Sequence, residues 1–314
     1  MNENQQVNLN NSRMLCMDVC TNKGLEEIKK VIGNTPLIEI DGVLAKLETT
    51  NPSGSIKDRI ASFMIEEAEK RGELKKGMKI IEVTTGNTGI ALSLVSLIKG
   101  YEFLAVTPEF VSDERKKMMK MFGAQIVLTP ASENMNGAVK KYEELIKENP
   151  NAWLPRQFEN EDNLIAHELG LGKEIIDETF GEIDAFVAGM GTGGTLIGVA
   201  RALKKVNPNI KIFGIEPEES PIITKGYSGA HKIQGIGEGF IPKLIKENMS
   251  LIDDVIRVSS EDAMKMRIEI VKKHGFFVGI SSGANFLVAK ELKKKYPRVV
   301  TVLPDRGERY LSLD

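Results

Sequence analysis

The stretch VAGMGTGGTLIGVARAL, residues 187–203, joins an apolar segment, a glycine-rich turn and an amphipathic segment. The apolar start is typical of a buried strand, and the apolar residues after the glycines recur at helical spacing. Glycine suits the tight connection between the two segments. The stretch therefore predicts a strand, a loop and a helix, which is the repeating unit of a parallel α/β sheet.

Segments of the same kind alternate along nearly the whole chain. We expect strands on both sides of a turn at Asp41 and Gly42, and then at 78–84, 103–106, 125–129, 184–189, 210–217, 254–259 and 299–304. We expect helices at 25–32, 57–71, 87–99, 112–122, 132–147, 162–179, 193–205, 260–274 and 282–294. A cluster of Pro, Asn and Trp at 148–155 interrupts the alternation and predicts a boundary between two lobes.

Composition excludes several classes of protein. The 314 residues are enough for about two domains, and 42 basic against 44 acidic residues argue against a nucleic-acid partner. The most apolar run, residues 90–98, is too short to cross a bilayer, and the polar first twelve residues do not resemble a secretory signal. We therefore expect a cytoplasmic protein. Cys16 and Cys20 have no neighbouring His or Cys that would complete a metal site, so we expect structural or incidental thiols and no metal.

Three strand-to-helix turns are candidate binding sites, because ligands of parallel sheets bind at the carboxyl ends of strands. The turn at 191–195, GTGGT, suits a phosphate, although tight packing alone also favours glycine there. The turn at 84–88, TTGNT, suits a carboxylate, although Thr and Asn are also ordinary helix caps. Ser281 and Ser282 lie between a strand-like segment and a helix, where serines are usually caps.

Lys57 stands in the turn NPSGSIKDRI, residues 51–60. A lysine at such a position is usually surface charge. A helix N-terminus nevertheless disfavours a cation, and a desolvated lysine is the amine that forms Schiff bases. Together with a phosphate loop, a carboxylate-binding turn and a serine turn, Lys57 matches what a pyridoxal 5'-phosphate (PLP) enzyme acting on an amino acid needs.

The ordered motifs from IGNTPLIEI (32–40) to PDRGERYLSL (304–313) resemble the cysteine synthase family, which includes O-acetylserine sulfhydrylases and cystathionine β-synthases. The resemblance implies an α/β protein of PLP fold type II, similar to the tryptophan synthase β subunit, with two lobes that each contain a helix-covered, mostly parallel sheet. We expect an N-terminal extension at 1–24, a small substrate-loop lobe at 47–158, and a large phosphate-binding lobe formed by 25–46 and 159–314.

The resemblance also implies a role for each matching residue. Lys57 would be the Schiff-base lysine and the base that removes the substrate's α-proton. Asn87 would contact the cofactor's 3'-hydroxyl, and Ser281, or Ser282 if the register slips by one, would bind the pyridine nitrogen. The cofactor phosphate would bind Gly191, Thr192, Gly194 and Thr195, and the substrate carboxylate would bind Thr84, Thr85, Gly86, Thr88 and Gln157.

The implied activity is β-replacement on a serine- or cysteine-type amino acid through an α-aminoacrylate. The leading hypothesis is the reaction of O-acetylserine with sulfide, which gives cysteine and acetate. Family members are usually homodimers, and the C-terminal peptide of serine acetyltransferase is a further expected partner. Neither the leaving group nor the nucleophile follows from the sequence.

The chain departs from the family pattern near the substrate. Thr85 stands where serine is common, and Gly170 to Lys173 replace the usual Thr-Thr-Gly-Pro after His167. In QGIGEGFIP, Glu238 occupies a position where the family often has alanine. Glu238 either points outward into solvent or acts as a general base for water or a thiol. The second reading would favour sulfide release from L-cysteine.

The sequence also leaves open two hypotheses from other functional classes. A nicotinamide-dependent dehydrogenase would use Gly191 to Thr195 for its cofactor and Glu216 as the ribose ligand. A catalytically silent relative would bind a partner peptide in its cleft.

Overall fold

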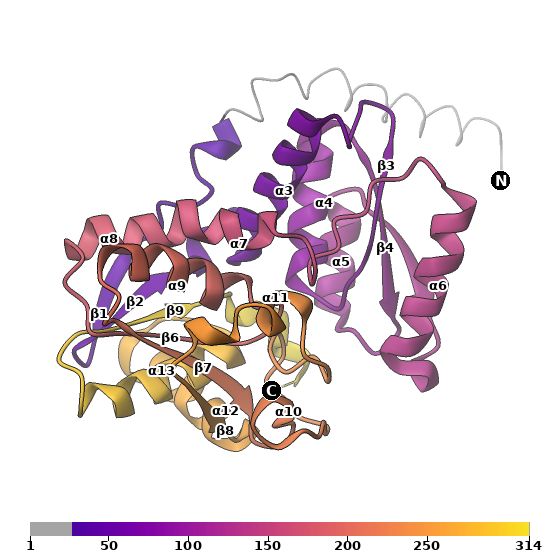
Figure 1. The fold of residues 1–314 in the computed structure, drawn as a ribbon. Helices are drawn as coiled ribbons and strands as arrows, with labels where there is room; N and C mark the ends of the chain where they lie inside the picture. The colour runs from indigo at the N-terminus through magenta and orange to yellow at the C-terminus, as the bar shows by residue number, and fades with distance from the viewer. Residues whose placement is uncertain (1–26, 314) are drawn as a thin grey trace.

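The computed structural model describes residues 27–313, and the proposed N-terminal extension at 1–24, with Cys16 and Cys20, lies outside this range. Two sheets organise the chain, as Figure 1 shows. The larger sheet has the order β1-β2-β9-β6-β7-β8 and the smaller has the order β3-β4-β5. All neighbouring strands are parallel except β1 and β2, so the expected α/β class with mostly parallel sheets is confirmed.

The strands of the larger sheet are β1 (Leu37–Ile40), β2 (Val43–Leu47), β6 (Ala185–Gly189), β7 (Lys211–Pro217), β8 (Asp254–Val258) and β9 (Val299–Leu303). Asp41 and Gly42 both have positive φ, 48° and 76°, and so form the expected tight turn between β1 and β2. The helices in this part of the chain are α7 (Asp162–Ala166), α8 (Lys173–Thr179), α9 (Gly194–Val206), α10 (Ile222–Lys225), α11 (Lys243–Lys246), α12 (Ser260–Glu269) and α13 (Ile280–Lys293).

Alternating side chains of β6 explain how the larger sheet is covered. Ala185 and Val187 are buried in the core shared with α12 and α13, whereas Phe186 and Ala188 belong to the core shared with α8 and α9. Successive residues of a strand face opposite sides of the sheet, so an uninterrupted apolar strand fills both cores. Figure 1 shows α7, α8 and α9 on one side of this sheet and α12 and α13 on the other.

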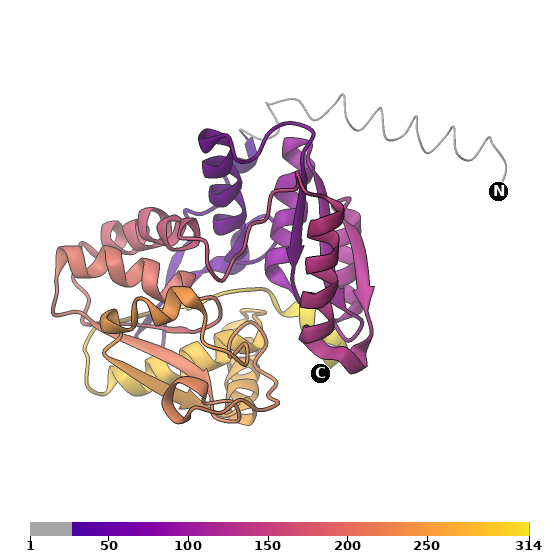
Figure 2. The same ribbon diagram turned by 45° about the vertical axis from the view of Figure 1, so that its right-hand side comes forward.

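The smaller sheet contains β3 (Lys79–Val83), β4 (Glu102–Pro108) and β5 (Gln125–Thr129), with the helices α3 (Lys57–Arg71), α4 (Asn87–Lys99), α5 (Asp113–Met121) and α6 (Asn134–Glu148). Ile80 packs with residues of α3 and α4, and the next residue, Ile81, packs with Ala138 of α6 on the opposite face. The two lobes are seen side by side in Figure 2, where the C-terminal segment crosses from the larger sheet towards the smaller one.

Two expected helices are interrupted. The segment at 162–179 consists of α7, a π-helix at His167–Gly172 and α8, and the segment at 260–274 ends in a π-helix at Ile270–His274. A Cβ on Gly172 would lie 2.5 Å from the Cβ of Ala202, so glycine allows this segment to pack closely against α9. Of the residues that depart from the usual Thr-Thr-Gly-Pro, Leu171 is fully buried in the core shared with α8 and α9.

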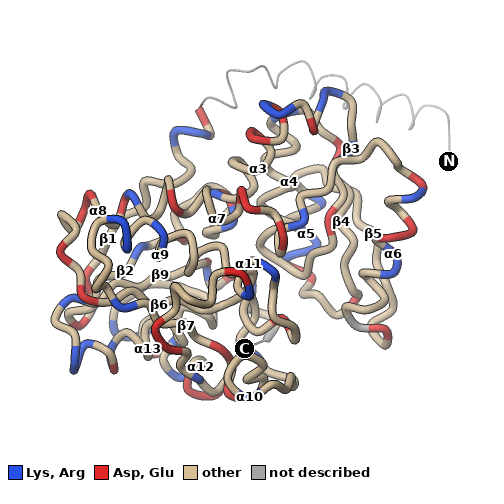
Figure 3. Tube along the Cα trace, viewed as in Figure 1, with Lys and Arg blue, Asp and Glu red and all other residues tan. Residues whose placement is uncertain are grey.

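Charged residues of both signs are interspersed along the described chain, as Figure 3 shows. No helix within residues 27–313 has the length and apolar character needed to cross a membrane.

Candidate active site

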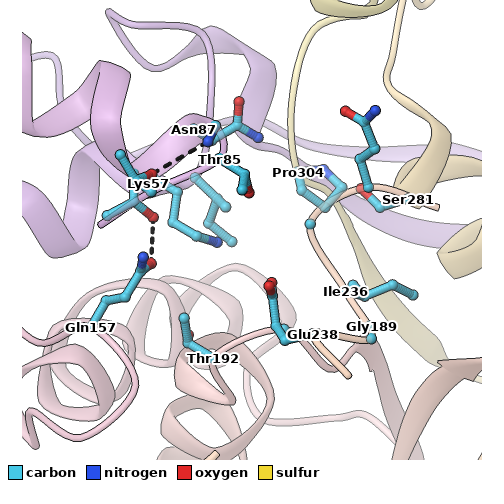
Figure 4. A pocket seen from close by; sticks show the side chains of 18 of the residues that line it. Lys57, Thr85, Asn87, Gln157, Gly189, Thr192, Ile236, Glu238, Ser281 and Pro304 are labelled. Carbon is cyan, nitrogen blue, oxygen red and sulfur yellow. Dashed lines mark hydrogen bonds between the residues drawn. The ribbon is translucent and has the colours of Figure 1, made fainter. Parts of the chain in front are cut away.

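A cavity of about 440 Å³ lies where the carboxyl ends of β3, β6 and β9 meet. This is the position at which parallel sheets place their ligands. The structure brings most of the residues singled out above to this cavity, which is lined by Lys57, Thr84, Thr85, Gly86, Asn87, Thr88, Gln157, Gly191, Thr192, Gly194, Thr195, Glu238 and Ser281. Figure 4 shows several of them pointing into one space from both lobes.

Lys57 is the first residue of α3, and the loop before it is held at both ends. The Asp58 carboxylate accepts a 2.6 Å hydrogen bond from the Ser53 amide, and the Ile56 amide donates to the Pro304 carbonyl at 2.8 Å, which joins the loop to the end of β9. Burial lowers the pKa of Lys57, while the charges of Asp305 and Glu238 act in the opposite direction. Lys57 thus extends from an anchored loop and places a partly buried amine in the cavity.

The loop at 191–195 has the form of an anion cradle. Gly193 has a φ of 93°, a conformation that favours glycine, and α9 begins at the next residue, so the first amides of that helix lack partners within it. The Thr192 hydroxyl oxygen accepts hydrogen bonds from Asn163 Nδ2 at 3.0 Å and from the Gly194 amide at 3.2 Å. Because both of these bonds use the oxygen as acceptor, the hydroxyl hydrogen remains available to an anion.

Glycine is also required in this loop for space. A Cβ on Gly191 would lie 2.4 Å from the Gly235 carbonyl oxygen, and one on Gly194 would lie 1.9 Å from Asn163 Oδ1. The backbone of the loop therefore packs tightly against its surroundings, and its helix-terminal amides favour a phosphate through hydrogen bonds and the helix dipole.

The loop at 84–88 is organised by threonine hydroxyls. Thr84 Oγ1 accepts from the Gly86 amide at 3.3 Å and from the Gly89 amide at 3.1 Å, which shapes the entry to α4. The Thr88 hydroxyl donates to Gln157 Oε1 at 2.6 Å. Since the Gln157 oxygen is engaged, its amino group is the part available to a ligand carboxylate.

Ser281 and Ser282 differ in position. The helix α13 begins at Ile280, two residues before the expected start at 282, so both serines lie in its first turn. The helix starts earlier because Val278 and Gly279 are tied to the end of β9, with the Gly279 amide donating to the Asp305 carbonyl at 2.9 Å. Ser281 lines the cavity, whereas the fully buried Ser282 hydroxyl has no hydrogen-bond partner in the described part of the chain.

Glu238 lies on a segment rich in glycine, between Gly237 and Gly239, which both have positive φ. Its carboxylate points into the cavity on the side opposite the loop of Thr85, as Figure 4 shows, and does not point outward. Burial raises the pKa of this carboxyl, and the charge of Lys57 lowers it. The site thus pairs a partly buried amine with a partly buried carboxylate across the space a substrate would fill.

Glu216 does not serve as a ligand-binding carboxylate. Its oxygens accept hydrogen bonds from the Ile223 amide at 2.9 Å and the Thr224 amide at 3.1 Å, and the side chain is only 2% exposed. These bonds hold the start of α10. The Glu216 carboxylate is therefore engaged by the protein and does not face a ribose-binding site. The hypothesis of a nicotinamide-dependent dehydrogenase therefore lacks the carboxylate that would bind the ribose.

The sequence indicated no role for three residues at the site. Asn163 ties Gln157 to the loop at 191–195, because its Nδ2 donates to the Gln157 carbonyl at 2.8 Å and to the Thr192 hydroxyl oxygen at 3.0 Å. His167, whose pKa is held well below its ordinary value by burial, lies 3.3 Å from the Thr195 hydroxyl. Asp305 accepts a 2.7 Å hydrogen bond from Asn87. Asp305 lies in the motif PDRGERYLSL, but no nearby residue indicated that it contacts Asn87 of the other lobe.

The donor set fits pyridoxal 5'-phosphate: a desolvated amine, a phosphate cradle and a cavity of suitable size lie together. The sequence profile of the family described as "Pyridoxal-phosphate dependent enzyme" matches residues 28–305. A cysteine synthase of Staphylococcus aureus is 47% identical over 302 residues, which cover 92% of this chain and 96% of that protein.

Solved structures show the same likeness. The crystal structure of a cysteine synthase from Entamoeba histolytica has a TM-score of 0.87 at 41% identity and covers 91% of this chain and 89% of that one. A hydrogen sulfide-producing enzyme from Fusobacterium nucleatum has a TM-score of 0.87 at 40% identity, covering 94% of this chain and 92% of that one.

Proposed function

The chain belongs to the pyridoxal-phosphate dependent enzymes, within the cysteine synthase family, and from this premise we propose that it makes cysteine from O-acetylserine and sulfide. The observation that carries the proposal is the convergence of Lys57, the loop at 84–88 and the loop at 191–195 on one cavity. An amine, a carboxylate site and a phosphate site at these positions suit an amino acid bound beside the cofactor.

Each part of the cavity then has a separate task. The amides after Gly193 and the Thr192 hydroxyl would hold the cofactor phosphate, and Ser281 would face the pyridine nitrogen. When bound, the cofactor supplies an electron sink beside the substrate's α-carbon, so that the β-substituent can leave and be replaced.

The substrate is held and deprotonated by the chain itself. The amides at the start of α4 and the Gln157 amino group would bind the α-carboxylate, which fixes the α-carbon near Lys57. Desolvation lowers the pKa of Lys57, so its free amine takes up the α-proton at Nζ more readily than an exposed lysine would at neutral pH.

The test uses protein reconstituted with the cofactor and supplied with O-acetylserine and sulfide. Wild type should form cysteine and acetate in equal amounts, and Lys57→Ala should form neither above the rate without enzyme. Wild type that binds the cofactor but yields no cysteine from these substrates would refute the proposal.

Glu238 favours a second candidate, sulfide release from L-cysteine. With water as nucleophile, the carboxylate would accept a proton from the attacking oxygen, the C–S bond would break, and the products would be serine and hydrogen sulfide. A carboxylate facing Lys57 in the cavity supports this reading, because burial that raises its pKa also makes the ionised form a stronger base.

Wild type and Glu238→Gln, compared on both reactions, separate the two candidates. If Glu238 activates the nucleophile, the glutamine variant should release less sulfide from L-cysteine by about a hundredfold or more and keep cysteine synthesis. Equal sulfide release by both proteins would remove Glu238 from the chemistry and leave the synthase reading.

The expected assembly and location also belong to the proposal. We infer a cytoplasmic homodimer, as in the family that the motifs resemble, with the serine acetyltransferase C-terminal peptide as a further partner of the cavity. Light scattering of the purified protein should give about twice the mass of one chain. A peptide that competes with substrate in a titration would support the second partner.

A further inference from the structure

The Asn87 side chain is held at both of its polar ends. Its Nδ2 donates to Asp305 Oδ2 at 2.7 Å, and its Oδ1 accepts from Arg309 Nε at 2.8 Å. Asp305 is 1% exposed and Arg309 is 0% exposed, so both partners are fixed inside the protein. Asn87 itself lines the cavity and is labelled in Figure 4.

These partners permit only one orientation of the Asn87 amide. A carboxylate only accepts hydrogen bonds and a guanidinium only donates them. Turning the amide over would place its oxygen against the Asp305 carboxylate and its amino group against Arg309, with both hydrogen bonds lost. The Asn87 amino group has two hydrogens, and Asp305 takes one, so a second N–H remains for a ligand in the cavity.

The two partners are themselves anchored. The Tyr310 hydroxyl donates to Asp305 Oδ2 at 2.6 Å, and Arg309 Nη2 donates to the Ser53 carbonyl. Ser53 is bound in turn by Asp58, which directly follows Lys57. The C-terminal segment thus fixes the Asn87 amide relative to the loop that carries the reactive amine.

We propose that Asp305 and Arg309 are positioning residues that hold the Asn87 amide with one N–H directed at the ring oxygen of the bound cofactor. The inference rests on the proposed function, because it takes Asn87 to face that oxygen. A hydrogen bond donated to the oxygen favours its ionised form, so loss of the fixed orientation should shift the ring oxygen towards its protonated form.

The test is the absorbance of the bound cofactor at one fixed pH, where the ionised and protonated ring oxygen give separate bands. Asn87→Ala and Asp305→Ala should both lower the ratio of the ionised to the protonated band, by roughly tenfold for a lost hydrogen bond to a charged group. The double variant should fall no further than Asn87→Ala, since both changes remove one interaction.

Ser312→Ala is the matched control. It lies in the same C-terminal segment, where its hydroxyl donates to Glu114, and it touches neither Asn87 nor Asp305. This variant should keep the wild-type ratio of bands. Cofactor loading and the circular dichroism spectrum of every variant are measured alongside, so that the ratio is compared only between folded, saturated proteins.

The outcomes separate this inference from the function on which it rests. If Asn87→Ala lowers the ratio and Asp305→Ala does not, the positioning role is wrong and the proposed function stands. An unchanged ratio in Asn87→Ala would show that Asn87 does not face the ring oxygen. If Asp305→Ala does not fold, Tyr310→Phe is the deciding variant. Removing the hydroxyl that fixes Asp305 should lower the ratio in the same direction, and an unchanged ratio would overturn the inference.

Discussion

The Thr88 hydroxyl donates a 2.6 Å hydrogen bond to the side-chain oxygen of Gln157. The bond joins the first turn of α4 to the segment that connects the two lobes, 69 residues further along the chain. Through Asn163, the same segment is tied to Thr192 in the loop at 191–195. The loops at 84–88 and 191–195 are therefore linked by side chains as well as by their common cavity.

Thr88→Val should weaken substrate binding, because valine keeps the shape of the side chain but no longer orients Gln157. We expect KM for the amino-acid substrate to rise about tenfold, with a smaller change in kcat. Steady-state kinetics measure both. Ser93→Ala is the control, since this buried hydroxyl of the same helix donates to the Gly89 carbonyl and does not line the cavity. An equal rise in KM for the two variants would contradict the prediction.

Gly191→Ala and Gly194→Ala should weaken cofactor binding at least tenfold, which is about 1.4 kcal/mol. The added Cβ would lie 2.4 Å from the Gly235 carbonyl oxygen or 1.9 Å from Asn163 Oδ1, so the loop must move. Titration of the apoprotein with cofactor gives the dissociation constants. Gly170→Ala, whose new Cβ would lie 3.4 Å from its nearest neighbour, Arg59 Nη1, should bind as wild type does.

Lys57→Arg should abolish the reaction while the cofactor still binds. Arginine keeps a positive charge in the cavity but has no free amine, so kcat should fall by at least about a thousandfold. Because the cofactor binds this variant without a covalent bond, gel filtration should remove it, whereas the cofactor of wild type should stay with the protein. Retention of the cofactor's long-wavelength absorbance by the variant would show that another group holds it.

Glu82→Gln should change how stability depends on pH. Burial raises the pKa of Glu82 from 4.5 to about 7 in the folded protein. Because the folded state holds this proton more tightly than the unfolded state, ionised Glu82 destabilises the fold. The destabilisation is absent below about pH 4.5, develops as the pH rises through about 7, and amounts to on the order of 3 kcal/mol.

Urea unfolding at several pH values measures this effect. Relative to wild type, Glu82→Gln should gain stability steadily from about pH 4.5 to about pH 7 and keep the gain above that range. Glu102→Gln, which removes an exposed carboxylate from the adjacent strand β4, should follow the wild-type profile. A constant difference between Glu82→Gln and wild type at all pH values would contradict the assignment.

The sequence predicted most of the regular elements because their signals are local. Apolar runs in β3, β4 and β6 and helical spacing in α3, α4 and α9 are patterns of neighbours a few residues apart. The sequence predicts the start of α13 two residues too late, because the start depends on the hydrogen bond from the Gly279 amide to the distant Asp305 carbonyl. The π-helices at His167–Gly172 and Ile270–His274 also went unpredicted, since no local pattern marks them.

The sequence alone determined the order of strands and helices, the glycine turns at their junctions and a lysine beside one such turn. Tertiary structure decided that Asp305 accepts a hydrogen bond from Asn87, 218 residues away in the chain. It also decided that Glu238 faces Lys57, and that Glu216 caps the start of a helix and does not bind a ligand. Short-range hydrogen bonding and side-chain periodicity set the first group. The second depends on how two sheets are placed against each other, which no stretch of sequence contains by itself.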